Sequence, residues 1–389
     1  MASPTAPRIL LVARELPASP HDGGGIRRRR LVDALCPVGP TAAFGLAPGP
    51  APTDDLVAWR TASDPAAART PEGPGVVEAL RAGRSPLAVV ESPSAVAELV
   101  AFVHEIRPDV VVVSGVELFA YVDVLRPLVP ALVFDLDYVQ AVGLGEMAAA
   151  DPHRARGLLW RHVLHTVADE ERAVLAAVDQ VWVSNEPERA RVEVAERVAV
   201  VPNVVDVDSY PHAERRDPGA LVYPARFDFW PNEEAARLLL DDVLPHLPDT
   251  TLTLVGTAPP DWLRERAGER VQVVGSVPDI RPYLAAAAVM PVPLMAGAGT
   301  RLKVLEAFAV GLPVVSTAKG VEGLALEAGR HYVQAETAPE FVAALARLRA
   351  DPHSADEMVA DARAWVEQHG SVSALRVAVA RALADVGVG

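Results

Sequence analysis

A stretch of small and charged residues at 297–306, GAGTRLKVLE, combines groups that an anionic ligand requires. It follows an apolar, strand-like run at 285–295 and opens a helical pattern. Small residues at such a turn let backbone N–H groups approach an anion, and the helix N-terminus adds about half a positive charge. Arg301 and Lys303 lie in the first turn, where the helix dipole disfavours cations unless an anion compensates. Glu306 lies three residues after Lys303 and shares its helix face.

This pattern suits a nucleotide sugar. The loop and the two cations match a diphosphate, and the carboxylate one turn later matches a sugar hydroxyl. The alternative is a plain amphipathic helix with a solvated pair of Lys303 and Glu306.

The elements that must position these residues form two similar halves. Buried apolar runs alternate with helical patterns, which predicts a doubly wound α/β fold. Strands are expected at 8–13, 110–113, 131–134, 180–184, 198–201, 221–223, 251–255, 271–274 and 313–317. Residues 47–75 are rich in Pro, Ala, Asp and Thr and predict an irregular connection.

We expect a Rossmann-like domain at 1–204, a polar linker at 205–219 and a second Rossmann-like domain at 220–370. The helical tail at 371–389 is expected to pack back on the first domain. Ligands of such domains bind at the carboxyl ends of the strands, so both halves are expected to face a central cleft.

Composition excludes several classes of protein. Half of the 389 residues are hydrophobic, which is enough for sizeable cores, and the formal net charge of −15 argues against nucleic acid as a general partner. Cys36 is the single cysteine, so no disulfide framework is expected. No apolar stretch reaches the roughly 20 residues of a membrane span, and the first residues lack a signal-peptide pattern. We therefore expect a cytoplasmic protein.

Several motifs recur in order along the second half. They are RFDFWPN at 226–232, VGSVPD at 274–279, the stretch at 297–306 and GLPVVST at 311–317. This ordered set resembles the group 1 glycosyltransferases, GT-B enzymes related to glycogen synthase and to bacterial cell-surface and natural-product sugar transferases. The resemblance is strong over about 220–350.

The resemblance implies roles on the donor side. Glu306 matches the glutamate that binds the donor ribose, and Arg226 matches the arginine that reaches the donor phosphate. Gly299 and Thr300 match the loop whose N–H groups face the diphosphate.

Two more loops match the family. Val277 and Asp279 lie in the loop near the nucleobase. Gly24 and Gly25 match the first-half loop that faces the diphosphate and the reacting sugar.

Two positions depart from the family pattern. Ala298 stands where the family often has a glutamate that touches the transferred sugar. Asn232 stands where a lysine often follows the arginine by about six residues. We expect Arg301 and Lys303 to supply the missing positive charge as the diphosphate departs.

Two carboxylates follow a strand in the first half. At the matching strand end, group 1 enzymes often carry an active-site histidine, so Asp135 or Asp137 is interpreted as an acceptor-side or reaction-centre group. The alternatives are helix capping, loop structure or a metal motif of the Asp-x-Asp kind. The charge run Arg27–Arg30 is either a solvated helix face or a source of one cation for an anionic substrate.

The resemblance implies a metal-independent, retaining transferase of the hexosyltransferase type, with no cofactor besides the nucleotide-diphosphate sugar. Its acceptor would be a small molecule or a glycan. A sugar-nucleotide epimerase of the same fold and a catalytically silent nucleotide-sugar-binding protein remain alternatives. The sequence does not indicate an oligomeric state.

Overall fold

The computed structural model describes residues 6–16, 23–47, 53–72, 74–86, 88–150, 155–192, 197–210, 217–297 and 299–388. The chain divides into two compact units. Unit 1 comprises Met1–Asn203 together with Ser373–Gly389, and unit 2 comprises Val204–Val372. Residues 204–210, which the sequence analysis placed mostly in a linker, are thus counted in unit 2.

Unit 1 is built on a parallel seven-stranded sheet with the order β3-β2-β1-β4-β5-β6-β7. Its central strands are fully buried runs of aliphatic residues, as a sheet covered on both faces requires. The strands are β1 (Ile9–Ala13), β2 (Thr41–Gly45), β3 (Ala58–Thr61), β4 (Val110–Ser114), β5 (Ala131–Asp137), β6 (Gln180–Val183) and β7 (Val198–Val200). This order places a topological switch point between β1 and β4.

The helices of unit 1 begin and end where the sequence supplies the signals. Ser92 caps α3 through a hydrogen bond from the Ala95 N–H, Pro93 follows at the first helical position, and Arg107 ends the helix in a left-handed conformation. The helices are α1 (Gly23–Leu35), α2 (Pro74–Arg81), α3 (Pro93–Ile106), α4 (Phe119–Leu125), α5 (Gln140–Ala150), α6 (Ala155–Ala176) and α7 (Glu186–Arg191), with 3-10 turns η1 (Val116–Leu118) and η2 (Arg126–Leu128).

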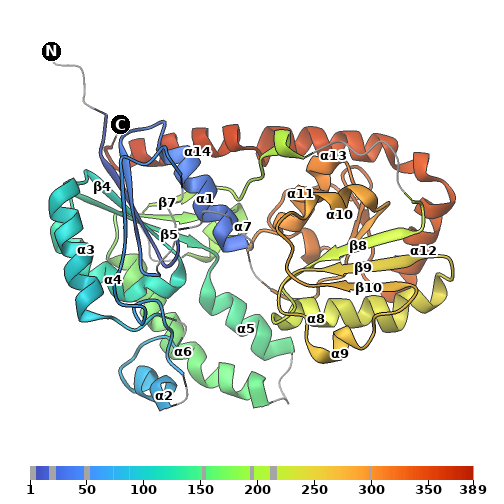
Figure 1. Cartoon of the computed structure of the whole chain (residues 1–389), viewed down its shortest axis with the longest axis horizontal. Helices are drawn as coiled ribbons and strands as arrows, with labels where there is room; N and C mark the ends of the chain where they lie inside the picture. The colour runs from blue at the N-terminus through green and yellow to red at the C-terminus, as the bar shows by residue number, and fades with distance from the viewer. Residues whose placement is uncertain are drawn as a thin grey trace. The chain divides into compact units, whose positions relative to one another are not determined.

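The last helix, α14 (Val372–Asp385), returns to unit 1 (Figure 1). The Arg376 side chain donates to the backbone oxygen of Asp33 on α1, at 3.3 Å. Arg197, just before β7, donates to the carbonyl of Asp385 at 2.8 Å.

Unit 2 contains two three-stranded parallel sheets with the orders β10-β9-β8 and β11-β12-β13. A bridge between Leu221 and Val289 joins the two sheets. The combined order β10-β9-β8-β11-β12-β13 is the strand order of a Rossmann-like domain. The strands are β8 (Ala220–Pro224), β9 (Thr251–Val255), β10 (Val271–Val274), β11 (Met290–Val292), β12 (Val314–Ser316) and β13 (Val333–Gln334).

The helices of unit 2 pack on these strands. The best buried is α11, which contacts β12 and α13 and ends at Gly311 in a left-handed conformation. The helices are α8 (Trp230–Arg237), α9 (Asp261–Arg264), α10 (Arg281–Ala286), α11 (Leu302–Val310), α12 (Ala338–Ala350) and α13 (Asp356–His369). A π-helical segment η4 (Leu238–Val243) and 3-10 turns η3 (Val207–Ser209), η5 (Leu244–His246), η6 (Lys319–Val321) and η7 (Pro352–Ala355) complete the unit.

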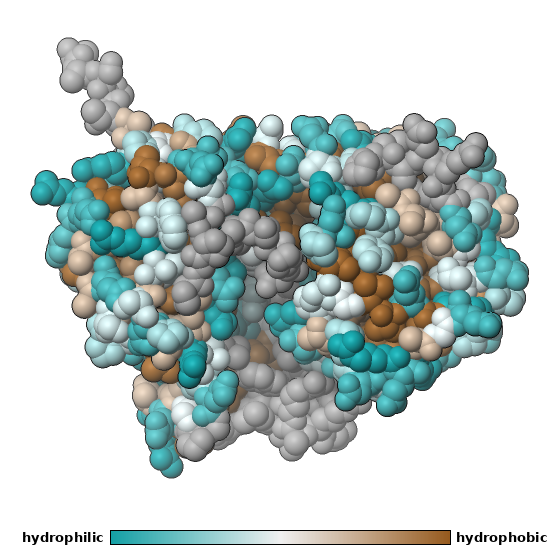
Figure 2. All heavy atoms as spheres, viewed as in Figure 1, coloured by the Kyte–Doolittle hydropathy of each residue, from teal (hydrophilic) through white to brown (hydrophobic). Residues whose placement is uncertain are grey.

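Apolar side chains of unit 2 gather over β8–β10 on the face seen in Figure 2. A shallow pocket of about 300 Å³ lies there, and Leu221, Val222 and Tyr283 contribute to its lining.

The predicted α/β fold with two Rossmann-like units is confirmed, and the expected cleft stays a prediction. Two expectations about single elements were wrong. The connection at 47–75 contains the edge strand β3, which is four residues long, has no buried residue and shows no alternation of apolar and polar residues. The run at 285–295 is not one strand, because Ala285 and Ala286 end α10 and pairing with neighbouring strands is confined to Val289 and Met290–Val292.

Candidate functional site

The switch point of unit 2 brings two predicted segments to one edge of the sheet. Arg226 follows β8, and the loop at 297–300 follows β11, which is the next strand along the sheet. Because both strands end at the same edge, these segments belong to one site. The strand order of the sheet thus brings together two segments that are more than 70 residues apart in the sequence.

The glycine loop is held from beneath by Arg301. Gly297 and Gly299 adopt positive φ angles of 113° and 77°, which other residues rarely tolerate. The Arg301 guanidinium donates to the carbonyls of Gly297, at 2.8 Å, and Gly299, at 3.0 Å. Arg301 is only 8% exposed and precedes α11 rather than lying in its first turn. Its charge therefore supports the loop through the backbone. Ala298 lies outside the described residues.

Glu306 is buried on the second turn of α11. It is 8% exposed, and the Tyr210 hydroxyl donates to its Oε1 at 2.9 Å. Burial raises the pKa of Glu306 to about 7, against the lowering effects of Tyr210 and Lys303. A carboxylate kept here at such a cost is typical of a functional site.

Lys303 lies one turn before Glu306, and its environment opposes its charge. Burial, followed by the nearby Arg301, lowers the pKa of Lys303 to about 7, while Glu306 acts in the other direction. Its ammonium lies 4.2 Å from the centre of the Tyr223 ring and donates to Asn232 Oδ1 at 3.2 Å. Lys303 is thus an amine at the N-terminus of α11 whose charged form a nearby anion would favour.

Three residues of this site escaped the sequence analysis as functional groups. Tyr210 fell in the expected linker, Tyr223 in an expected strand, and Asn232 was noted only as a departure from the family. Tyr210 and Asn232 form hydrogen bonds with residues of α11 that are 96 and 71 residues away in the sequence, and Tyr223 contacts Lys303 through its ring face. No local pattern signals such contacts.

The other predicted donor-side residues lie in exposed or paired settings. The Arg226 side chain is 56% exposed and forms an ion pair with Asp228 at 2.8 Å. Asp279 accepts from the Arg281 side chain at 2.8 and 2.9 Å, which lowers the pKa of Asp279. Val277 is half-buried in the same loop. Their roles toward a ligand stay predictions.

In unit 1, Asp135 is the centre of a buried network. Its carboxylate is fully buried and pairs with the Arg27 guanidinium, with Nε at 3.0 Å from Oδ1 and 3.1 Å from Oδ2. The Ser114 hydroxyl donates to Oδ2 at 2.7 Å. Arg27 also donates to the Val201 carbonyl and to Asn203. Both oxygens of Asp135 are therefore occupied within the protein.

Asp137, two residues further, has a different environment. Its side chain is 28% exposed, and its backbone has a φ of 60°, where a non-glycine residue is strained. Asn203 donates to its Oδ1 at 2.8 Å. Of the two predicted carboxylates, Asp137 is the one that solvent or a substrate reaches. Gly24 and Gly25 lie at the start of α1, one turn before Arg27.

Among the described residues, no group of three or more His, Cys, Asp or Glu side chains is arranged to hold a metal ion. No helix in the described part of the chain is long and apolar enough to cross a membrane.

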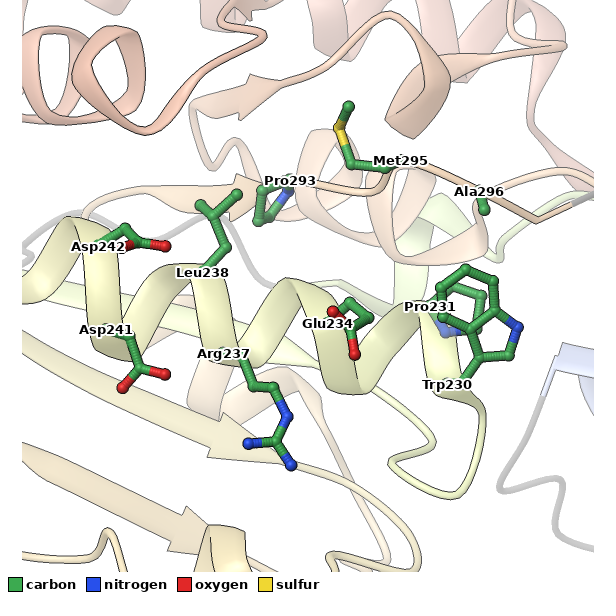
Figure 3. Close-up of a pocket in the computed structure, with 10 residues that line it drawn as sticks. All are labelled: Trp230, Pro231, Glu234, Arg237, Leu238, Asp241, Asp242, Pro293, Met295 and Ala296. Atoms are coloured by element: carbon green, nitrogen blue, oxygen red, sulfur yellow. The ribbon is translucent and has the colours of Figure 1, made fainter. Parts of the chain in front are cut away.

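A separate pocket of about 250 Å³ lies along α8 and η4 (Figure 3). Trp230, Pro293 and Met295 provide apolar walls, while Glu234 and Asp242 add carboxylates. Arg237 offsets one of the three lining carboxylates, Glu234, Asp241 and Asp242, so the lining keeps a net negative charge that disfavours a diphosphate.

Comparison with known proteins identifies the class. Residues 218–351 match the family of glycosyl transferases group 1. The chain resembles sucrose-phosphate synthase from Thermosynechococcus elongatus, with a TM-score of 0.73, 19% identity and coverage of 98% of this chain and 99% of that one. It also resembles Anabaena HepE in complex with UDP-glucose, with a TM-score of 0.68, 17% identity and coverage of 97% and 100%. The chain matches no curated protein sequence.

A third similar structure is a mutant of S. aureus TarM in complex with fondaparinux, α-GlcNAc-glycerol and UDP, with a TM-score of 0.67, 9% identity and coverage of 97% and 99%. The predicted resemblance is thereby confirmed. Residues 218–351 match the group 1 glycosyl transferases, and the chain as a whole has the GT-B fold of the similar structures.

The buried pair in unit 1 yields a prediction about stability. Replacing Arg27 by Met leaves the Asp135 carboxylate buried and unpaired, which costs about 3–5 kcal/mol of unfolding free energy. Urea denaturation measures this loss. Arg29→Ala is the control, because Arg29 forms a partly exposed pair with Asp33 on the same helix, and such a pair contributes under about 1 kcal/mol. Equal losses in the two variants would contradict the assignment.

Glu306 yields a prediction about pH. Its folded-state pKa lies above its ordinary value of 4.5, so stability is lost as pH rises from about 4.5 to 7. Glu306→Gln removes that penalty. We expect the variant to gain about 1–3 kcal/mol of unfolding free energy at pH 8 and nothing at pH 4. Denaturant titrations at the two pH values test this, and a variant less stable than wild type at pH 8 would disprove a destabilising charge.

Proposed function

We propose that this glycosyltransferase moves a sugar from a nucleotide-diphosphate donor to an acceptor hydroxyl, without a metal ion and with retention of anomeric configuration. The buried pair of Lys303 and Glu306 beside the glycine loop carries this proposal. The structures of HepE with UDP-glucose and of TarM with UDP make UDP-sugars the first donors to test. Retention rests on the resemblance to group 1 enzymes.

The proposed mechanism follows from where charge develops. As the glycosidic bond to the donor breaks, negative charge grows on the departing diphosphate. Lys303, the loop N–H groups at Gly299 and Thr300 and the N-terminus of α11 stabilise that charge. Arg301 contributes from beneath the loop, and Arg226 can exchange its exposed ion pair with Asp228 for a phosphate oxygen.

Glu306 supplies the second part of donor recognition. Its carboxylate accepts hydrogen bonds from the ribose hydroxyls, with Tyr210 fixing its orientation. The productive state requires Glu306 ionised and Lys303 protonated. Because both pKa values lie at about 7 in the free protein, we expect donor affinity to be highest near neutral pH.

In unit 1, we assign the acceptor side to Asp137 rather than to Asp135. Asp135 is fully buried, and both of its oxygens already accept hydrogen bonds from Arg27 or Ser114. Gly24 and Gly25 keep their proposed role at the donor diphosphate. The acceptor is a small molecule or a glycan of the natural-product or cell-surface kind.

The first test is UDP binding by calorimetry. Glu306→Gln removes a charged hydrogen-bond acceptor worth about 1.5–3 kcal/mol, so affinity falls tenfold or more. Lys303→Met removes the cation at similar length and has a comparable effect. Glu327→Gln, an exposed carboxylate of the same unit, is the matched control and leaves UDP affinity unchanged. Wild-type affinity in Glu306→Gln and Lys303→Met would overturn the donor site.

The second test concerns metal ions. We expect UDP binding and release of sugar from UDP-glucose to survive EDTA, because cationic side chains and a helix N-terminus neutralise the diphosphate. Turnover is measured before and after chelation, then with Mg²⁺ or Mn²⁺ added. Loss of turnover with EDTA and recovery with metal would show that the metal-free mechanism is wrong.

A further inference from the structure

Asn232 contacts three parts of the donor site at once. Its Oδ1 accepts from the Tyr223 hydroxyl at 3.0 Å and from Lys303 Nζ at 3.2 Å. Its Nδ2 donates to the Arg226 carbonyl at 2.9 Å. One amide therefore ties β8, the loop that carries Arg226 and the first turn of α11 together.

Tyr223 completes the seat of the lysine. It is fully buried, and its ring face lies under the Lys303 ammonium at 4.2 Å. An aromatic face attracts a cation without neutralising it. Phe227 packs edge-on against the same ring at 6.4 Å and restrains its orientation.

We propose that Asn232 and Tyr223 are positioning residues for Lys303. The amide oxygen and the ring face hold the ammonium at the carboxyl edge of the sheet, and its remaining N–H groups are left for the donor diphosphate. This inference rests on the proposed donor site and names the residues that make its cation effective.

The charge arrangement explains why an amide is suited to position 232. A lysine there would bring a second ammonium to the place where Asn232 Oδ1 now accepts from Lys303. Two like charges so close disfavour each other's charged form. The carbonyl oxygen of Asn232 instead favours the charged form of Lys303, so the single cation of this pair of positions resides on α11.

The other groups around Lys303 are accounted for. Arg301 at the N-cap of α11 and Glu306 one turn after Lys303 act in opposite directions on the pKa of Lys303. Tyr223 stays neutral, because burial raises the pKa of its hydroxyl far above the ordinary value. Arg226 and Asp228 pair with each other at 2.8 Å, and Tyr210 donates to Glu306.

The decisive measurement is the pH dependence of UDP affinity between pH 6 and pH 9. Affinity falls at high pH as Lys303 loses its proton. We call this fall in affinity at high pH the alkaline limb. Asn232→Ala removes an acceptor of the ammonium, so we expect the alkaline limb to shift to a pH about half to one unit lower. Asn232→Asp places a negative charge there, and the limb moves up by about one unit or more.

Three further variants separate positioning from folding. Tyr223→Phe keeps the ring face and loses only the hydroxyl that donates to Asn232, so it weakens UDP binding less than Tyr223→Leu, which removes the face and weakens binding about tenfold. Asn185→Ala is the matched control, because Asn185 caps α7 in unit 1; it lowers the melting temperature without moving the limb. Melting temperatures of all variants are recorded alongside.

A relocation of the charge gives an independent check. Lys303→Met alone weakens UDP binding, and adding Asn232→Lys to it restores at least part of the lost affinity. If Lys303→Met has no effect on affinity, the proposed donor role of Lys303 fails. If Lys303→Met weakens binding but the two Asn232 variants leave the alkaline limb in place, the positioning role fails while the donor site stands.

Discussion

The desolvation of Lys303 and Glu306 is the constraint on which the candidate site of unit 2 depends. Both charges sit on a helix whose other residues from Val304 to Val310 are buried, and burial shifts each pKa to about 7. The surrounding groups compensate only in part: an aromatic face, one amide oxygen and one phenol hydroxyl. Placing α11 here requires β11 beside β8, and hence the strand order of the whole unit.

The buried charges of unit 1, in contrast, are fully compensated within the protein. Arg27 and Asp135 satisfy each other, with Ser114, Val201 and Asn203 completing the network. A fully satisfied buried pair rigidifies its surroundings and offers nothing to a ligand. In a partly satisfied pair, such as Lys303 with Glu306, the charges are incompletely compensated, and a ligand of suitable charge can stabilise them. The degree of compensation, rather than burial itself, separates the structural charges from the functional ones.

The sequence predicts the elements that are continuous in the chain. The aliphatic strands, the glycine loop before α11 and the placement of Arg226 after β8 all follow from local patterns. It does not predict partners brought together by packing. Tyr210, Tyr223 and the amide of Asn232 lie far from α11 along the chain, and the inward turn of Arg301 toward its own loop depends on two glycine φ angles. The same limit made Asp135 and Asp137 indistinguishable until the buried Arg27 separated them.

A cation at Lys303 differs from a lysine at position 232 in its environment as well as in its location. At the first turn of α11 the helix dipole and Arg301 both oppose a positive charge. The free protein therefore holds a lysine that is only partly protonated near pH 7. A bound diphosphate reverses that balance, because an opposite charge at hydrogen-bonding distance favours the ammonium. In the proposed mechanism, donor binding and proton uptake by Lys303 are thus one linked equilibrium, and the full cation exists chiefly when a leaving group is there to be stabilised.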